Sequence, residues 1–281
     1  MSTPRAAERP VSNLVQRVLT ALVALPIAVG GLWLGGWPFA ALVAGVSVVA
    51  QAELYGLMRK AGVRPLVVLG LPLGVLAALH VFLPWVRPVL LVGGIAVFLA
   101  AMFRQTDTPI QDVSGTLFGV FYPPALLGTA VALREAHGPG LDAGDGFYLT
   151  LAVLAAVWGA DTVAYFIGRA VGRHPLFPRI SPKKTWEGAA GGLLGAVAVA
   201  AAFKLTALPP LSWLDVGVIA LCAAGAGLLG DLAESGFKRS VGAKDSAAWL
   251  PGHGGLLDRL DAAAVALPLA TLYLDHVAGL F

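Results

Sequence analysis

The sequence predicts an all-α protein, a polytopic bundle of transmembrane helices, and three observations support this fold class. First, 58% of the 281 residues are hydrophobic and 12% are charged, whereas about a quarter of the residues are charged in an ordinary soluble domain. Second, the apolar residues form continuous runs rather than the alternating pattern of a membrane β-barrel. Third, the basic residues are divided unevenly between the intervening loops. No polar linker divides the chain, so we expect residues 1–281 to form one membrane-embedded domain.

Each span of a bilayer needs about 20 mostly apolar residues, and about nine segments meet this requirement. In chain order they are Leu14–Gly35, Pro38–Leu57, Pro65–Leu83, Pro88–Met102, Thr116–Leu133, Phe147–Gly168, Ala189–Ala207, Leu214–Gly230 and Ala262–Phe281. The first apolar run continues without a charge from Val18 to Trp37. It is longer than the ~7–15-residue core of a cleavable signal peptide, so we expect an uncleaved first span.

The distribution of Lys and Arg predicts the orientation, because cytoplasmic loops are enriched in these residues. An N-terminus in the cytoplasm places sixteen of the 19 basic residues on the inner side. They are Arg5, Arg9, Arg17, Arg59, Lys60, Arg64, Arg104, Arg169, Arg173, Arg179, Lys183, Lys184, Lys238, Arg239, Lys244 and Arg259. Arg87 and Arg134 fall outside, and Lys204 falls near the end of a span. We therefore expect residues 1–13 to be a cytoplasmic tail.

Two long segments on the predicted cytoplasmic side, residues 169–188 and 231–261, hold most of the ionisable groups. In the second segment, a helix continued past Asp231 would place four polar side chains on one face. They are Asp231, Glu234, Ser235 and Lys238. Asp258 and Asp261 then open the last span, three residues apart. The carboxylates thus stand at the two membrane ends of one cytoplasmic excursion.

Carboxylates at these positions are candidate metal ligands, because Mg²⁺ takes hard oxygen ligands together with waters and substrate phosphates. Lys238, Arg239, Lys244 and Arg259 could bind phosphate charges, and the intervening glycines allow backbone N–H groups to approach an anion. Such parts suit phosphoryl or nucleotidyl transfer. The alternative is a solvated charged loop in which Asp residues cap helices.

The first segment offers two cations and two hydroxyls for a triphosphate or a lipid phosphate. They belong to Ser181, Lys183, Lys184 and Thr185, and Glu187 follows at the start of a glycine-rich span. A basic anchor on anionic lipid explains the same residues equally well. Asp161 falls in the inner half of a span, where an unpaired acid is costly, so we expect a basic partner or a metal contact. The glycines of the sixth to eighth spans suit close helix packing.

Residues 235–261, SGFKRSVGAKDSAAWLPGHGGLLDRLD, resemble the full signature of the phosphatidate cytidylyltransferase family. Residues 181–188, SPKKTWEG, and residues 161–168, DTVAYFIG, are similar to the family's other cytoplasmic elements. The first four spans are similar only in hydropathy. The resemblance implies conversion of CTP and phosphatidic acid into CDP-diacylglycerol and pyrophosphate, for phospholipid biosynthesis in the bacterial inner membrane. It places the N-terminal spans in residues 14–133 and the catalytic spans and loops in residues 147–281.

The expected mechanism is direct in-line attack by the lipid phosphate, assisted by Mg²⁺ with a second metal ion left open. We expect Asp231 and Asp258, with Asp261, to bind the metal. The other expected catalytic residues are Lys238, Arg239, Lys244, His253 and Arg259; a loop-shaping role for His253 fits as well as a phosphate contact. The expected substrate-binding residues are Ser181, Lys183, Lys184, Thr185, Glu187, Ser235, Gly254, Gly255 and Asp161. Glu234 is expected to be either a support for the metal ligands or a solvated group.

The expected partners are CTP, phosphatidic acid and membrane lipid, with no nucleic acid, and a homodimer is left open. A related alternative is another lipid nucleotidyltransferase or phosphotransferase, for example one acting on a polyprenyl or archaeal ether lipid. A cation-coupled transporter is the alternative from a different class. It predicts charged residues near the midplane of several spans, whereas the spans here are nearly free of charge at their centres.

Overall fold

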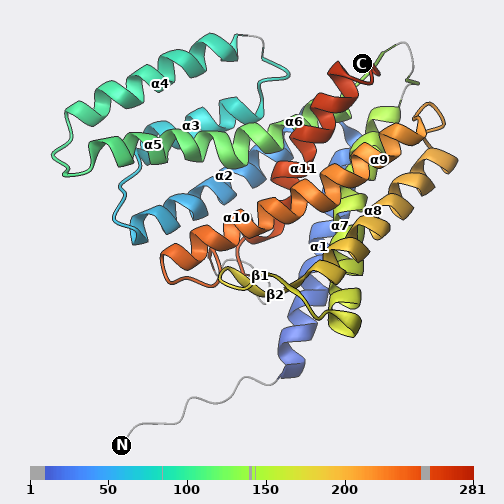
Figure 1. The fold of residues 1–281 in the computed structure, drawn as a ribbon. Helices are drawn as coiled ribbons and strands as arrows, with labels where there is room; N and C mark the ends of the chain where they lie inside the picture. The colour runs from blue at the N-terminus through green and yellow to red at the C-terminus, as the bar shows by residue number, and fades with distance from the viewer. Residues whose placement is uncertain (1–9, 84, 139–140, 143, 248–253) are drawn as a thin grey trace, which may run out of the picture.

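The computed structural model describes residues 10–83, 85–138, 141–142, 144–247 and 254–281. These residues are almost entirely helical (Figure 1). The first half contains α1 (Pro10–Leu34), α2 (Gly36–Lys60), α3 (Val67–Ala78), α4 (Val86–Met102), α5 (Pro109–Val120) and α6 (Leu126–Arg134). The second half contains α7 (Asp145–Val171), β1 (Pro175–Phe177), β2 (Ser181–Thr185), α8 (Trp186–Thr206), α9 (Trp213–Leu221), α10 (Gly227–Ser240) and α11 (Leu257–His276).

Five helices in the described residues are long and apolar enough to cross a membrane. They are Gly36–Lys60, Pro109–Arg134, Asp145–Val171, Trp186–Thr206 and Trp213–Ser240. Shorter apolar helices cover Leu22–Leu34, Val67–Ala78 and Val86–Met102. The last helix, α11, carries Asp258, Arg259 and Asp261 in its first two turns, which lowers its mean hydropathy. The predicted helical membrane protein is thereby confirmed, with a short β1–β2 hairpin added within residues 169–188.

Two of the long helices are continuous through π-helical turns. Phe121–Ala125 joins α5 to α6 around Pro123 and Pro124, and Cys222–Ala226 joins α9 to α10. The eighth span was expected to end at Gly230, but its helix runs on to Ser240. Asp231 therefore lies within α10. Because the helix continues past Asp231 as expected, Lys238 lies on the same face, seven residues further on. The fifth expected span likewise begins earlier, at Pro109.

Helices α2 to α6 form one side of the molecule, and α7 packs along α8 on the other, with α10 and α11 between them (Figure 1). Glycines allow the close approach of α7 and α8, because a Cβ at Gly192 would lie 3.0 Å from the Ala160 carbonyl oxygen. Phe118 of α5 packs edge-on against Phe237 of α10. The core thus joins the first half of the chain to the helices that carry the polar residues.

The sharp turn between α1 and α2 is held from α6. Gly35 has a φ of 63°, a conformation that favours glycine. The Arg134 guanidinium donates through Nε to the Leu32 carbonyl oxygen at 2.6 Å, at the end of α1. Glu135 accepts the Gly36 N–H at 2.7 Å, at the start of α2. The charges of this pair match the dipoles of the two helix ends.

Candidate active site

A polar pocket, which we define by its charged residues Asp161, Arg169, Lys183, Lys184 and Asp231, opens between α7, α8, α10 and the β1–β2 hairpin. About 1380 Å³ of space lies within the pocket and its mouth, and Tyr165, Thr185 and glycines 168 and 188 complete much of its wall. Three stretches of the sequence, residues 161–169, 183–189 and 228–231, therefore contribute to one cavity. Five residues expected to bind substrate or metal meet here: Asp161, Lys183, Lys184, Thr185 and Asp231.

The Lys184 ammonium makes an ion pair with Asp231, with Nζ and Oδ2 separated by 2.5 Å. The Ser235 hydroxyl donates to the other oxygen of Asp231 at 3.3 Å, one helical turn further along α10. Both side chains of the ion pair remain partly exposed. The pair therefore links the hairpin to α10 while leaving its charges within reach of a ligand in the polar pocket.

Three carboxylates from three helices act on one another at this end of the molecule. The negative charge of Asp231 acts on Asp161 of α7 and on Asp261 of α11, and Lys184 partly offsets it. Asp261 is buried, and one of its oxygens accepts the Ala262 N–H at 2.8 Å. Carboxylates whose charges act on one another are stabilised by a cation. The positive charge of Lys184, which pairs with Asp231, also acts on Asp161.

The hairpin is fixed at the entrance of α8 by two side chains. Thr185 is the N-cap of α8, and its hydroxyl accepts the Gly188 N–H at 3.1 Å. Glu187 accepts hydrogen bonds from the backbone N–H groups of Arg173 and His174 and contacts the His174 ring at 2.5 Å. Glu187 therefore holds the loop before β1, whereas it was expected to bind substrate. Ser181 begins β2, opposite Phe177.

A second cluster surrounds Lys238, two turns further along α10 from Asp231. Its Nζ lies 2.5 Å from Glu234 Oε2, one turn earlier on α10, and 2.6 Å from Asp258 Oδ1 on α11. The Glu234 side chain is fully buried at 0% exposure. Of the two expectations for Glu234, a solvated group is wrong. A buried acid next to a buried lysine is stabilised only as part of such a pair.

Asp258 accepts a dense set of hydrogen bonds besides the one from Lys238. Its Oδ2 accepts from the Gly255 N–H at 2.8 Å and from the N–H and hydroxyl of Ser246, both at 3.0 Å. Burial would raise the pKa of the Asp258 carboxyl, but Lys238 together with the Gly255 and Ser246 donors outweighs burial and holds the pKa below its ordinary value. Asp258 precedes Ala262, where the apolar stretch of α11 begins.

The glycines of the signature permit this packing. Gly254 has a φ of 78°, and a Cβ there would lie 3.0 Å from Asp258 Oδ2. A Cβ at Gly255 would collide with the Ser246 hydroxyl and the Glu53 carboxylate. Both glycines were expected to bind substrate, and in this structure they bring backbone close to carboxylates.

Glu53 of α2 is a site residue that the sequence analysis missed. Its side chain is 4% exposed, and Oε1 accepts the Leu256 N–H at 2.9 Å. Oε2 accepts the Leu257 N–H at 2.8 Å and the Ser246 hydroxyl at 2.9 Å. Glu53 thus caps the N-terminus of α11 from a distant helix and shares Ser246 with Asp258. An acid inside an otherwise apolar span was the available signal.

The remaining predicted residues lie around these clusters. Arg239 donates to the Ala243 carbonyl oxygen at 2.8 Å and is exposed, as are Lys244 and Arg259. His253 lies outside the described residues, so its expected role stays a prediction. Most of the expected site residues are therefore gathered at one end of α7, α10 and α11.

The carboxylate oxygens of these clusters can be compared with the ligands that Mg²⁺ prefers. The described residues contain no group of three or more His, Cys, Asp or Glu side chains that is already arranged around a metal position. Asp231 and Asp261 nevertheless present hard carboxylate oxygens whose charges act on each other. Mg²⁺ usually takes one or two carboxylates with waters and substrate phosphates. The residues present therefore fit a magnesium ion that binds together with a phosphate substrate.

Apolar helices that end in paired carboxylates and lysines define a membrane-embedded enzyme that handles phosphate groups. Comparison with known proteins identifies the family within this class. The sequence model of the cytidylyltransferase family matches residues 15–277. The chain therefore belongs to the cytidylyltransferase family, and the resemblance found in the motifs is confirmed.

Three relatives are similar to this chain over nearly their whole length, and each is named phosphatidate cytidylyltransferase. The protein from Brucella abortus is 34% identical over 275 residues, which cover 94% of both chains. The protein from Synechocystis is 32% identical over 90% of this chain and 94% of its own. The protein from Bacillus subtilis is 31% identical over 91% of this chain and 96% of its own.

Proposed function

We propose that this protein transfers the cytidylyl group of CTP to phosphatidic acid, giving CDP-diacylglycerol and pyrophosphate. The observation that supports this most directly is the polar pocket, where Lys184 pairs with Asp231 within a membrane protein of the cytidylyltransferase family. A soluble nucleotide and a lipid must meet in this reaction. A polar cavity at the ends of apolar helices brings both within reach of the same side chains.

In the proposed reaction, an oxygen of the lipid phosphate attacks the α-phosphorus of CTP. A new P–O bond forms, the bond from the α-phosphorus to the bridging oxygen breaks, and pyrophosphate leaves with that oxygen. Lys183 and Lys184 line the polar pocket, which supports a role for them in binding phosphate charges. No protein nucleophile is needed, because the lipid phosphate is already ionised. Catalysis of such a transfer rests on positioning and charge neutralisation.

We propose that Asp231, Asp258 and Asp261 hold the magnesium ion. When bound, it would neutralise charge that develops on the phosphate oxygens. The charge of Asp231 acts on Asp261, whereas Asp258 forms an ion pair with Lys238. Lys238 of α10 pairs with the candidate ligand Asp258 of α11. The pair therefore holds the start of α11 close to α10. Lys238, Arg239, Lys244, His253 and Arg259 remain the proposed groups for phosphate or positioning.

The proposed topology is one membrane domain of about nine spans with a cytoplasmic N-terminus and a cytoplasmic site. The division of the basic residues between the loops supports it. A cysteine replacing exposed Asp142 is expected to react with an impermeant thiol reagent from outside intact cells. A cysteine replacing Ala247 is expected to react only after the membrane is opened. Reversed labelling would contradict both the orientation and the cytoplasmic site.

The enzymatic proposal is tested with purified protein in lipid nanodiscs, radiolabelled nucleoside triphosphates and phosphatidic acid. With Mg²⁺ we expect CDP-diacylglycerol and pyrophosphate from CTP, and little product from ATP or GTP. Polyprenyl phosphate in place of phosphatidic acid tests the acceptor. Formation of ADP from ATP would indicate a kinase, and transfer to polyprenyl phosphate alone would identify a different acceptor; either result contradicts the proposal.

A further inference from the structure

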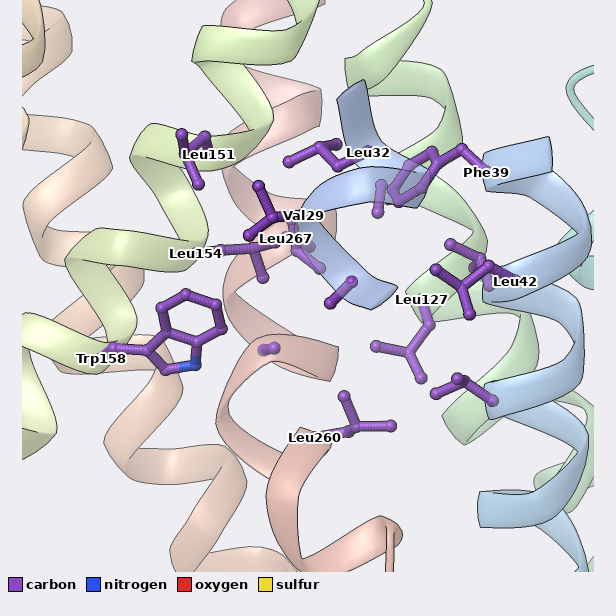
Figure 2. Close-up of a pocket in the computed structure, with 15 residues that line it drawn as sticks. Val29, Leu32, Phe39, Leu42, Leu127, Leu151, Leu154, Trp158, Leu260 and Leu267 are labelled. Carbon is purple, nitrogen blue, oxygen red and sulfur yellow. The ribbon is translucent and has the colours of Figure 1, made fainter. Parts of the chain in front are cut away.

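A separate apolar pocket lies between α1, α2, α6, α7 and α11 (Figure 2). About 740 Å³ of space lies within the pocket and its mouth. Trp158 and Leu260 lie at one end in Figure 2, and Leu151, Leu32 and Phe39 lie at the other. All fifteen lining residues are apolar. The pocket suits a hydrocarbon chain and offers no partner for a polar group.

The apolar pocket and the polar pocket lie along one stripe of α7. Leu151, Leu154 and Trp158 line the apolar pocket, and Asp161 and Tyr165 line the polar one. Their spacings of three, four, three and four residues place them on a continuous helical face. Leu151 and Trp158 are about 10 Å apart along the helix axis at 1.5 Å per residue. The same face therefore changes from apolar to charged as it reaches the candidate active site.

Helix α11 shows the same change from charge to apolar surface. Leu260, Ala263 and Leu267 line the apolar pocket, and Arg259 precedes Ala263 by four residues, one turn away on the same side. Asp258 instead faces α10, where it pairs with Lys238. The first turn of α11 thus carries charged residues, and the following turns line the apolar pocket.

We propose that the apolar pocket binds an acyl chain of the lipid substrate, with its phosphate held in the polar pocket at the charged end of the same face of α7. The inference rests on the proposed function and adds to it the place where the lipid lies. The occupant is set by the two ends together, because a lipid with a small anionic phosphate can satisfy the basic end while one chain enters the apolar pocket. A lipid whose phosphate carries a bulky cationic headgroup brings a positive charge next to Arg169, Lys183 and Lys184 and is expected to bind less well.

The first test locates the chain without requiring turnover. Phosphatidic acid with a diazirine at the end of one acyl chain is photolysed with the wild-type protein in nanodiscs, and labelled peptides are mapped. We expect the label on Leu151, Leu154 and the facing part of α1, and competition by excess phosphatidic acid. A phosphatidylcholine probe is expected to label exposed surfaces such as Leu194 of α8 instead. Equal labelling patterns from both probes would overturn the proposal.

The second test fills the pocket. Val29 of α1 lines it, whereas Ile27 on the same helix is 55% exposed and does not line it. Val29→Trp is expected to lower kcat/KM at least about tenfold for long-chain phosphatidic acid but less than about twofold for dihexanoyl phosphatidic acid. KM for CTP is expected to be unchanged, and Ile27→Trp is expected to match the wild type. An equal effect of Val29→Trp on both lipids, or no effect on either, would contradict the proposed chain site.

The two tests separate this inference from the enzymatic proposal. If wild-type protein converts no phosphatidic acid but the diazirine label maps to the pocket, the proposed reaction fails and the chain site stands. If phosphatidic acid is converted with a chain-length dependence that Val29→Trp leaves intact, the reaction stands and the chain site fails.

Discussion

Glu53 gives the most demanding test of the site, because it acts from a helix that the signature motifs do not include. Its carboxylate accepts hydrogen bonds from the Leu256 and Leu257 N–H groups and from the Ser246 hydroxyl. Ser246 also donates to Asp258. Replacing Glu53 with Gln keeps the size of the side chain but removes its charge and one acceptor oxygen. The change therefore weakens the N-terminal cap of α11 with little effect on packing volume.

The magnitude follows from the contacts that are lost. A hydrogen bond to a charged group contributes about 1.5–3 kcal/mol, and an unsatisfied buried donor costs about 1–3 kcal/mol. Gln can still accept from one N–H, so we expect Glu53→Gln to lower the free energy of unfolding by about 2–4 kcal/mol. A displacement of about 1 Å in the first turn of α11 can reduce turnover about a hundredfold. We therefore expect kcat to fall about tenfold to a hundredfold.

The assay compares kcat, KM for CTP and the Mg²⁺ concentration for half-maximal activity in nanodiscs. A positioning role predicts a lower kcat and a severalfold higher Mg²⁺ requirement, because Asp258 shares Ser246 with Glu53. Glu135→Gln is the matched control, since Glu135 caps α2 through the Gly36 N–H at the other end of that helix. It is expected to lower stability without changing kcat. If both variants change activity alike, Glu53 is merely structural and the argument fails.

The remaining predictions concern the metal and phosphate groups. Asp231→Asn and Asp258→Asn are each expected to lower turnover more than about a thousandfold in protein that still inserts and purifies, and the double variant should lose little more. More than about a tenth of wild-type activity in Asp258→Asn would remove Asp258 from the metal ligands. Glu234→Gln is expected to do less, because Lys238 keeps its contact with Asp258. Chelation of Mg²⁺ should abolish product formation and added Mg²⁺ should restore it, and persistent activity in excess chelator would exclude the metal. Lys184→Gln should raise KM for CTP, measured by initial rates, and an unchanged KM would leave Lys184 without a phosphate contact.

Much of the site could be predicted because its residues lie close together in the sequence or in known motifs. Helical spacing correctly placed Asp231 and Lys238 along one stretch of α10, since that helix does continue to Ser240. Continuous apolar runs predicted the helices, and the glycines between α7 and α8 predicted their close packing. The family emerged from the same signature and was confirmed over residues 15–277.

Contacts between distant segments could not be predicted, because one sequence carries no record of which helices meet. Glu53 lies about two hundred residues from the backbone groups that it caps. The pairing of Lys184 with Asp231 depends on the hairpin, whose short strands give too weak an alternating pattern to predict. The ends of the spans were also inexact, since apolar character fades before the helix stops. The contact of Glu187 with His174 could not be predicted either, because its position near the lysines does not reveal which way its side chain turns; its expected role in substrate binding stays a prediction.

The unbroken helix from Trp213 to Ser240 fixes the register between the membrane and the reaction site. Asp231 and Lys238 are seven residues apart, about 10 Å along the helix axis. Inserting one alanine between them would rotate everything beyond it by about 100° and turn Lys238 away from Asp258. Inserting a seven-residue segment would restore the angle to within about 20° but shift Lys238 by about two turns. Neither length change preserves both angle and height, so deletions and insertions should be tolerated before Trp213 or after Ser240 far better than between these two residues.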